Sequence, residues 1–194
     1  MKPEIFAVAL KDNIEDDTFN YLFRFVEKDK QARVNRLKFK KDKDLIVVGD
    51  ILAKTAIRKV LGVAVADMRF GVREFGKPYL ANHENAHFNI SHSGDIVVCA
   101  VYDKPVGVDI QKMNDVNFDS IANRVFTKNE QERYLSAPQE KQREQFYKIW
   151  TAKESYIKFL GTGIKDLSKE IDPDCVIGLS CVFNDYILAV CCKP

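Results

Sequence analysis

The order of apolar and polar stretches predicts a chain in which short strands and helices follow one another. Apolar runs of strand length fall at residues 5–10, 67–70, 88–91, 96–102, 106–110, 175–182 and 186–192. Ser93-Gly94-Asp95 separates two of these runs, which are therefore expected to pair as a hairpin. Residues 74–78 contain Gly76 and Pro78 and are predicted to form a turn.

The segments between the strands are predicted to be helical. Their expected ranges are 18–26, 30–36, 43–61, 118–125, 128–135 and 146–160. Thr18 is expected to cap the first helix, whereas Gly62 and Gly161 follow the two longest ones, where glycine commonly ends a helix. Thr127 and Glu130 have the spacing of a capping box, which gives Glu130 a structural role without invoking catalysis.

The two halves of the chain resemble each other in sequence. Ala53-Lys54 and Lys59-Val60-Leu61-Gly62 recur 99 residues later as Ala152-Lys153 and Lys158-Phe159-Leu160-Gly161. At an offset of 100, Arg24, Lys28, Gln31 and Arg33 recur as Arg124, Lys128, Gln131 and Arg133. Chance similarity between lysine-rich helices would explain either match alone. Two matches at nearly the same offset, in the same order, indicate an internal duplication.

A duplication of this kind predicts an α+β fold of two similar α/β lobes in a pseudo-twofold arrangement. The expected lobes are residues 1–104 and 105–194, with the ligand in the cleft between them.

Composition places the chain among soluble globular proteins. It has 194 residues, of which 46% are hydrophobic and 30% charged. The longest apolar run, 96–102, is far shorter than the roughly 20 residues that span a membrane, and the N-terminus lacks a signal-peptide pattern. The five cysteines show no C-x-x-C spacing. We therefore expect a reduced, cytoplasmic protein with no membrane partner.

Charge is nearly balanced overall but uneven along the chain. The net charge is +2, yet residues 27–44 hold eight Lys or Arg against four acidic residues, a local charge of +4. A solvated helix face is the common explanation, and phosphate binding is the more specific one. The small net charge and the absence of aromatic residues between positions 27 and 38 count against a nucleic-acid partner.

His83-Glu84-Asn85-Ala86-His87 matches the H-E-x-x-H pattern of zinc proteases. That pattern needs a helix, on which both imidazoles face one side. Here it follows Gly76, Pro78 and Asn82, runs into the strand predicted at 88–91, and has no helical apolar period. A polar loop is the better interpretation, and a zinc hydrolase is the weaker alternative.

A carboxylate and two lysines share the last predicted helix. Trp150, Glu154 and Lys158 are spaced by four residues and so lie on one face, with Lys153 beside them. Asp109 stands near the end of a predicted strand, where a side chain can face a cleft. Two carboxylates with lysines close by suit Mg²⁺ and a bound phosphate, because Mg²⁺ takes few protein oxygens and shares the rest with phosphate and water. Taken singly, Asp109 could be a strand-end residue and Glu154 an ion-pair partner of Lys158.

Together these motifs resemble the 4′-phosphopantetheinyl transferase superfamily, in its single-chain, two-lobed branch of the surfactin-synthetase-activating type. The matching segments are Gly76-Lys77-Pro78, Phe88-Asn89-Ile90-Ser91-His92-Ser93, Val106-Gly107-Val108-Asp109, Phe126-Thr127-x-x-Glu130 and Trp150-x-x-Lys153-Glu154-Ser155-x-x-Lys158. The resemblance extends from about Lys30 to Leu160, and several spaced motifs in one order rarely arise by chance.

The resemblance implies a magnesium-dependent transferase that acts as a monomer. Such enzymes move the phosphopantetheine arm of coenzyme A onto a serine of an apo acyl or peptidyl carrier protein and release adenosine 3′,5′-bisphosphate. Coenzyme A would be the co-substrate, bound in the cleft between the lobes.

The resemblance also implies roles for individual residues. The Mg²⁺ ligands would be Asp109, Glu154 and Gln111, the last directly or through a coordinated water. Coenzyme A would be held at its 3′-phosphate by Lys30, Arg33 and Ser91, at its diphosphate by His92 and Lys158, and at its adenine by Lys77 and Pro78. Glu130 or Glu154 would orient or deprotonate the serine, and Lys153 and Lys158 would stabilise charge.

Two positions depart from the pattern of that branch. Gln111 stands where a third acidic ligand is common, so the metal site lacks one negative charge. Ile46 stands where some relatives carry a hydroxyl residue near the 3′-phosphate. A non-catalytic coenzyme A-binding protein is kept as an alternative to the enzyme, and the basic residues between 27 and 44 keep a nucleic-acid-binding protein as another.

Overall fold

The computed structural model describes residues 2–115, 118–163, 166–183 and 185–194. In chain order its elements are β1 (Glu4–Ala9), α1 (Asp16–Phe23), α2 (Lys28–Asn35), α3 (Lys40–Leu61), a 3₁₀ turn (Val65–Asp67), β2 (Phe70–Val72), β3 (Pro78–Leu80), β4 (His87–Ser93), β5 (Ile96–Tyr102), β6 (Val106–Lys112), α4 (Phe118–Val125), α5 (Lys128–Leu135), α6 (Gln139–Leu160), β7 (Val176–Val182) and β8 (Tyr186–Cys192).

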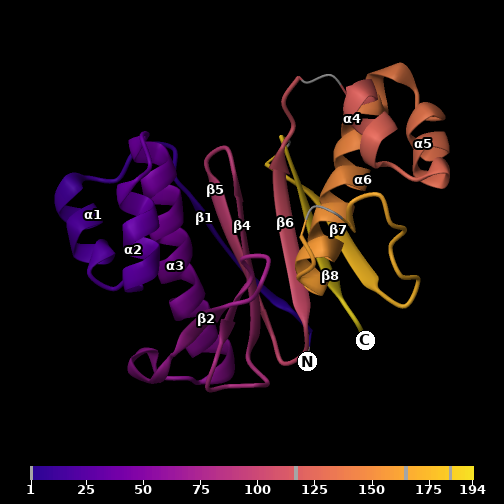
Figure 1. The fold of residues 1–194 in the computed structure, drawn as a ribbon. Coiled ribbons are helices and arrows are strands. Elements are labelled where there is room, and N and C mark those ends of the chain that lie inside the picture. The colour runs from indigo at the N-terminus through magenta and orange to yellow at the C-terminus, as the bar shows by residue number, and fades with distance from the viewer. Residues whose placement is uncertain (1, 116–117, 164–165, 184) are drawn as a thin grey trace.

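The element order repeats in the two halves of the chain. Each half has a strand, then three helices, then a pair of strands, apart from the small β2–β3 hairpin. Within each half the last strand lies in the middle of an antiparallel sheet, in the orders β1-β5-β4 and β6-β8-β7. The helices cover the outer sides and the two sheets lie between them (Figure 1). The α+β prediction with two similar lobes is confirmed.

Individual side chains repeat the same relation. The Gln31 side-chain amide donates to the Val26 carbonyl (2.8 Å), and that of Gln131 donates to the Phe126 carbonyl (3.2 Å), in both cases five residues back. These glutamines are one of the pairs that match at an offset of 100. The duplication in the sequence therefore coincides with a duplication of local structure.

Apolar residues form a core in each lobe and another between the sheets. In the first lobe, α3 packs Ala53 and Ile57 against Cys99 and Val101 of β5. In the second, an aromatic cluster surrounds Phe146 of α6. The core between the sheets is shared, and consists of Ile96, Val98, Ala100, Tyr102, Val106, Val108, Ile110, Tyr186 and Val190. Since both sheets contribute to this last core, burial of apolar area holds the lobes together.

Gly107 lets α6 approach β6 closely. A Cβ atom at this position would lie 2.0 Å from the carbonyl oxygen of Ser155 and 2.3 Å from the backbone nitrogen of Phe159. No side chain fits there. The absence of one allows the backbone of α6 to rest directly on β6, next to Asp109.

The ends of the two long helices and the start of α5 agree with the sequence patterns. Gly62 and Gly161 end α3 and α6 with φ of 70° and 72°, as predicted. The capping box is confirmed: Glu130 accepts from the Thr127 backbone N–H, and its own N–H donates to the Thr127 hydroxyl.

Several local predictions were wrong. Thr18 lies inside α1, whose N-cap is Glu15 with no side-chain cap, and acidic side chains in the first turn suit the positive end of the helix. Helix α6 begins at Gln139 rather than Phe146. Residues 65–67 form a 3₁₀ turn where a strand was expected to begin. Pro78 opens β3 instead of belonging wholly to a turn.

None of the described helices has a stretch both long and apolar enough to cross a bilayer.

Candidate functional site

The two lobes meet where β4 lies against β6. Three β4 side chains, spaced by two residues, point the same way because strand side chains alternate. They accept hydrogen bonds from backbone N–H groups of β6: Asn89 Oδ1 from Val108 (2.8 Å), Ser91 Oγ from Ile110 (3.3 Å) and Ser93 Oγ from Lys112 (3.0 Å). Strand β6 is an edge strand of its own sheet, so these bonds give partners to backbone N–H groups that no neighbouring strand of that sheet could pair.

Asp109 is the buried carboxylate at the centre of this junction, with 1% of its surface exposed. Its Oδ1 accepts from the Ser91 hydroxyl (2.7 Å) and from Lys158 Nζ (2.5 Å), and its Oδ2 from Gln111 Nε2 (3.0 Å). Lys158 also donates to Ser91 Oγ (2.8 Å). A carboxylate can be buried only with such partners, because the uncompensated charge would cost several kcal/mol.

Glu154 lies one helical turn before Lys158 on α6 and is half-buried. Burial raises the pKa of its carboxyl group, and the negative charge of Asp109 raises the pKa further, whereas Lys158 lowers it. Two carboxylates from different elements therefore repel each other at one site. A divalent cation between them would remove that repulsion, so the side chains fit the Mg²⁺ ligand pair expected from the sequence.

The third candidate ligand, Gln111, faces the same carboxylate but presents its amide nitrogen. Its Nε2 donates to Asp109, so its oxygen would have to turn in order to contact a cation. Among the described residues no group of three His, Cys, Asp or Glu side chains could hold a metal ion. A site here would have two charged protein ligands.

The side chain of Lys153 does not lie beside that of Glu154, although the two residues are adjacent in the sequence. Adjacent helical residues point about 100° apart, and Lys153 is buried on the other side of α6 with 1% exposure. Its ammonium donates to both oxygens of Glu130 (3.0 and 2.7 Å) and to the Lys169 carbonyl (2.9 Å). The charges of Glu130 and Lys153 thus neutralise each other within the second lobe. Their ion pair joins α5 to α6.

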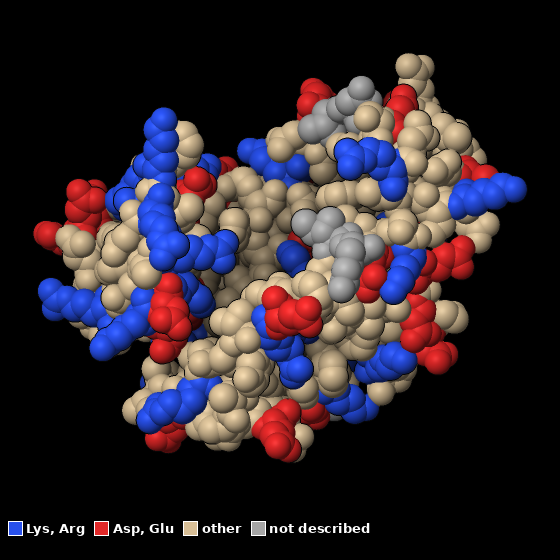
Figure 2. All heavy atoms as spheres, viewed as in Figure 1, with Lys and Arg blue, Asp and Glu red and all other residues tan. Residues whose placement is uncertain are grey.

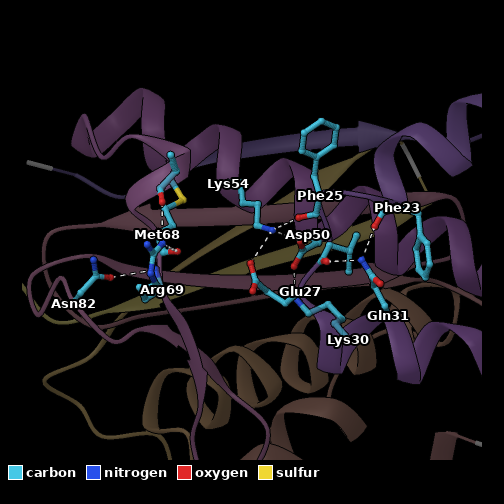
Figure 3. Close-up of polar contacts among 12 residues, drawn as sticks. Phe23, Phe25, Glu27, Lys30, Gln31, Asp50, Lys54, Met68, Arg69 and Asn82 are labelled. Atoms are coloured by element: carbon cyan, nitrogen blue, oxygen red, sulfur yellow. Dashed lines mark hydrogen bonds and ion pairs between the residues drawn. The ribbon is translucent and has the colours of Figure 1, made fainter.

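Lys30 is occupied as well. It forms an ion pair with Asp50 of α3, and Asp50 pairs with the buried Lys54 (2.9 Å) (Figure 3). Lys54 in turn pairs with Glu27 (3.1 Å) and donates to the Phe25 carbonyl. The ion pair with Asp50 offsets the positive charge that Lys30 would offer to a phosphate.

The other cations expected to bind phosphate are Arg33, His92 and Lys158, which come from elements of both lobes. Figure 2 shows a hollow between the lobes with Lys and Arg side chains around it. Desolvation lowers the pKa of His92, and the positive charges of Lys158 and Arg33 lower it further, while Asp42 and Asp109 raise it. His92 therefore lies within electrostatic range of a cation from each lobe, because Arg33 belongs to α2 and Lys158 to α6.

A pocket of about 200 Å³ adjoins this centre. Its lining consists of Phe75, Gly76, Lys77, Pro78, Asn89, Ile90, Ile157, Lys158, Gly161 and Gly163. Lys77 and Pro78 thus border a pocket that also contacts Lys158. The ammonium of Lys77, however, donates to the backbone carbonyls of Val106 and Phe159, both at 3.0 Å.

The H-E-x-x-H segment has no helical geometry. His83 lies in the turn before β4 and His87 begins the strand, so the two imidazoles do not share a helix face. The preference for a loop over a zinc-protease helix is confirmed.

Comparison with known proteins gives this site a family. Residues 105–190 match a family model described as the 4′-phosphopantetheinyl transferase superfamily, and residues 13–104 match the N-terminal model of 4′-phosphopantetheinyl transferases. Over 161 residues, which are 83% of this chain and 71% of each relative, the chain is 41% identical to a 4′-phosphopantetheinyl transferase of Bacillus subtilis and 37% identical to the transferase ffp of the same species. Identity to Sfp of Bacillus subtilis strain 168 is 32% over the same shares.

The chain belongs to the 4′-phosphopantetheinyl transferase superfamily.

In this phosphopantetheinyl transferase the structure brings several of the motif residues together, but their contacts differ in part from those expected. Ser91 was grouped with Lys30 and Arg33, yet it lies against Asp109 and Lys158. A hydroxyl has one donor and two acceptor sites, and Ser91 uses all three on Asp109, Lys158 and the backbone of Ile110. Asn89 and Ser93 were not singled out. The signal that could have found them is the polar residue at every second position of an otherwise apolar strand.

Proposed function

We propose that this transferase moves the 4′-phosphopantetheine group of coenzyme A onto a serine of an apo acyl or peptidyl carrier protein, with release of adenosine 3′,5′-bisphosphate. The observation that carries the proposal is the Asp109, Glu154 and Lys158 group at the lobe junction of a chain from this family. A non-catalytic coenzyme A-binding protein is the second candidate, because Gln111 leaves the site one charge short.

Asp109 and Glu154 would hold Mg²⁺, and Gln111 would contact it after its amide turns, directly or through a water. Bound there, Mg²⁺ supplies Lewis-acid neutralisation of the charge on a diphosphate. The raised pKa of Glu154 supports this assignment, since a cation beside it would keep the carboxyl ionised.

The cations of the cleft would bind the anionic parts of coenzyme A. Lys158 and His92 would hold the diphosphate, and Arg33 and Lys30 the 3′-phosphate, Lys30 with the donors that its ammonium keeps beside Asp50. Lys77 and Pro78 would border the adenine in the neighbouring pocket. We assign Ser91 to orienting Asp109 and Lys158, because its hydroxyl contacts both.

Glu154 is the stronger candidate for the base. The carboxylate of Glu130 is engaged by Lys153 and by the cap of α5, outside the Asp109 centre. In the proposed step the serine oxygen of the carrier forms a bond to the β-phosphorus, and the bond to the oxygen shared with the adenosine-linked phosphate breaks. The serine proton passes to Glu154, directly or through a water, and Lys158 stabilises the charge that develops.

The wider organisation is proposed on the same basis. We divide the chain into lobes 1–104 and 105–194, which meet in the short connection between β5 and β6. A monomer in the cytoplasm, acting on a small carrier protein and on neither nucleic acid nor membrane, is the form we expect.

Intact-mass spectrometry tests the activity. Apo acyl and peptidyl carrier proteins are incubated with coenzyme A, Mg²⁺ and the transferase. We expect a mass increase of one phosphopantetheine, which is lost with EDTA and with Glu154→Ala. Exposed Lys141→Met is the matched control on the same helix and should leave the increase intact. Absence of transfer to every carrier, with coenzyme A still bound, would favour the non-catalytic alternative.

A further inference from the structure

Lys77 separates two pockets at the lobe junction. One is the pocket beside Lys158 described above. The other, also about 200 Å³, is lined by Arg73, Lys77, Pro78, Tyr79, Ala86, His87, Phe88, Pro105, Phe159 and Leu160. The side chain of Lys77 therefore runs through the protein between them rather than out into the cleft.

The carbonyl oxygens that accept hydrogen bonds from the Lys77 ammonium belong to the other lobe. Lys77 directly precedes β3 of the first lobe, whereas Val106 begins β6 and Phe159 lies in the last turn of α6. The carbonyls of the last helical turn have no partner within the helix. A cation there also interacts favourably with the negative end of the helix dipole.

These contacts lie close to the candidate site without touching its carboxylates. Phe159 is adjacent to Lys158 in sequence, and Val106 precedes Asp109 by three residues on the same strand. Fixing the Phe159 and Val106 carbonyls therefore fixes the elements from which Lys158 and Asp109 project.

We propose that Lys77 is a positioning residue, whose ammonium ties β3 to the carboxyl end of α6 and to the start of β6 and so holds Lys158 and Asp109 in register. The proposal rests on the proposed function for its kinetic consequence, but the tie itself does not. It also gives Lys77 a role other than bordering the adenine of coenzyme A.

The electrostatic surroundings agree with this burial. The pKa of Lys77 is lowered to about 8, mainly by desolvation and also by the positive charge of Arg73, whereas Cys191 raises it. His87 is also near, and its own pKa is lowered by burial and by the charges of Lys77 and Arg73, whereas Asp103 raises it. Burial also keeps Cys191 a neutral thiol by raising its pKa.

The lowered pKa of Lys77 makes its contribution to the stability of the fold depend on pH. The pKa of Lys77 is lower in the folded chain than in the unfolded one, so the unfolded chain binds more protons between about pH 8 and 10.5. The contribution of this lysine to stability therefore rises with pH in that window. A neutral amine keeps two N–H donors, enough for both carbonyls.

The test compares Lys77→Met, which has a similar length but no donor, with Lys77→Arg, which keeps donors, and with Lys141→Met as an exposed control. Melting temperatures of all four proteins are measured from pH 7 to 10. We expect the difference between wild type and Lys77→Met to grow with pH above 8, and that between wild type and Lys141→Met to stay constant. Equal melting temperatures of wild type and Lys77→Met throughout the series would overturn the tie.

Steady-state transfer supplies the second readout. For Lys77→Met, corrected for its folded fraction, we expect kcat to fall on the order of ten- to a hundredfold. The KM for coenzyme A should change by less than about threefold, with partial recovery of kcat in Lys77→Arg. A raised KM with unchanged kcat would mean that Lys77 binds the ligand directly, and unchanged values of both would remove the positioning role.

The two proposals fail separately. If wild type transfers nothing to any carrier, the proposed function fails, while the pH series of melting temperatures still decides whether Lys77 ties the lobes.

Discussion

Asp109 is a buried carboxylate whose two oxygens have partners even without a cation. Lys158 and Ser91 take one oxygen, and Gln111 takes the other. A cation that binds here must therefore replace some of these hydrogen bonds. Gln111 matters most, because its amide donates to the carboxylate in the metal-free chain and would offer its oxygen to a metal.

Gln111→Glu should separate the two states of this site. Without metal, a second carboxylate beside Asp109 has no proton to donate, so the free energy of unfolding should fall by about 1–3 kcal/mol. With metal, the added charge should tighten Mg²⁺ binding by about tenfold. Thermal melts without metal and a Mg²⁺ titration check the two halves, and an unchanged titration would show that Gln111 does not face the cation.

Glu130 and Lys153 form a second buried pair, and the contacts of both lie outside the Asp109 centre. Glu130→Gln keeps the capping box but leaves the buried ammonium of Lys153 without a counter-charge. We expect a loss of about 3–5 kcal/mol in the free energy of unfolding, measured by urea denaturation.

The double variant Glu130→Gln/Lys153→Met is the control for that loss. It removes the stranded charge together with its partner, so it should recover much of the stability of the wild type. A double variant as unstable as Glu130→Gln alone would mean that the stranded charge of Lys153 is not the cause of the loss.

At the scale of elements, the contact of β6 with α6 depends on a glycine. Gly107→Ala would place a methyl group 2.0 Å from the Ser155 carbonyl oxygen, so backbone must move. We expect a loss of stability of about 3 kcal/mol or more, and transfer activity reduced along with the displaced α6.

Gly178→Ala is the matched substitution in β7, where the nearest atom to the added methyl group is 4.0 Å away. It should change the melting temperature little. Equal effects of the two substitutions, measured by circular dichroism, would contradict the close approach inferred for Gly107.

The elements predicted well are those whose sequence carries its own pattern. Gly62 and Gly161 ended the long helices, and apolar runs gave the strands of the two main sheets. The first turns of α6 were missed because residues 139–145 are all polar and so show no apolar period. Thr18 misled, because Asp16 and Asp17 start the helix earlier.

The candidate site was predictable in part for the same reason. Asp109, Glu154 and Lys158 could be grouped from spaced motifs. The partners of Lys30, Lys77 and Lys153 could not, because each is a contact across elements or lobes that no local spacing encodes. Lysines that look like free cations in the sequence are bound to Asp50, to backbone carbonyls and to Glu130.

At the scale of the whole molecule, the repeated topology identifies equivalent positions. Asp109 pairs with the fourth residue of β8, and Phe6 pairs with the fourth residue of β5, so Phe6 occupies in the first lobe the place of Asp109 in the second. Lys59 corresponds to Lys158 at the offset of 99, and its ammonium lies over the Phe6 ring at 5.3 Å. The equivalent of Glu154 at this offset is Thr55.

Two lobes of nearly the same fold therefore carry the candidate metal-binding carboxylates in the second lobe only. At the equivalent positions the first lobe has a lysine, but an aromatic ring and a hydroxyl in place of the two carboxylates. We expect titration calorimetry to give a stoichiometry of one Mg²⁺ and one coenzyme A per chain. A second equivalent of either would mean that the first lobe retains a working half-site. A single equivalent would mean that the two lobes share a fold, while only the second carries the side chains that bind the ligands.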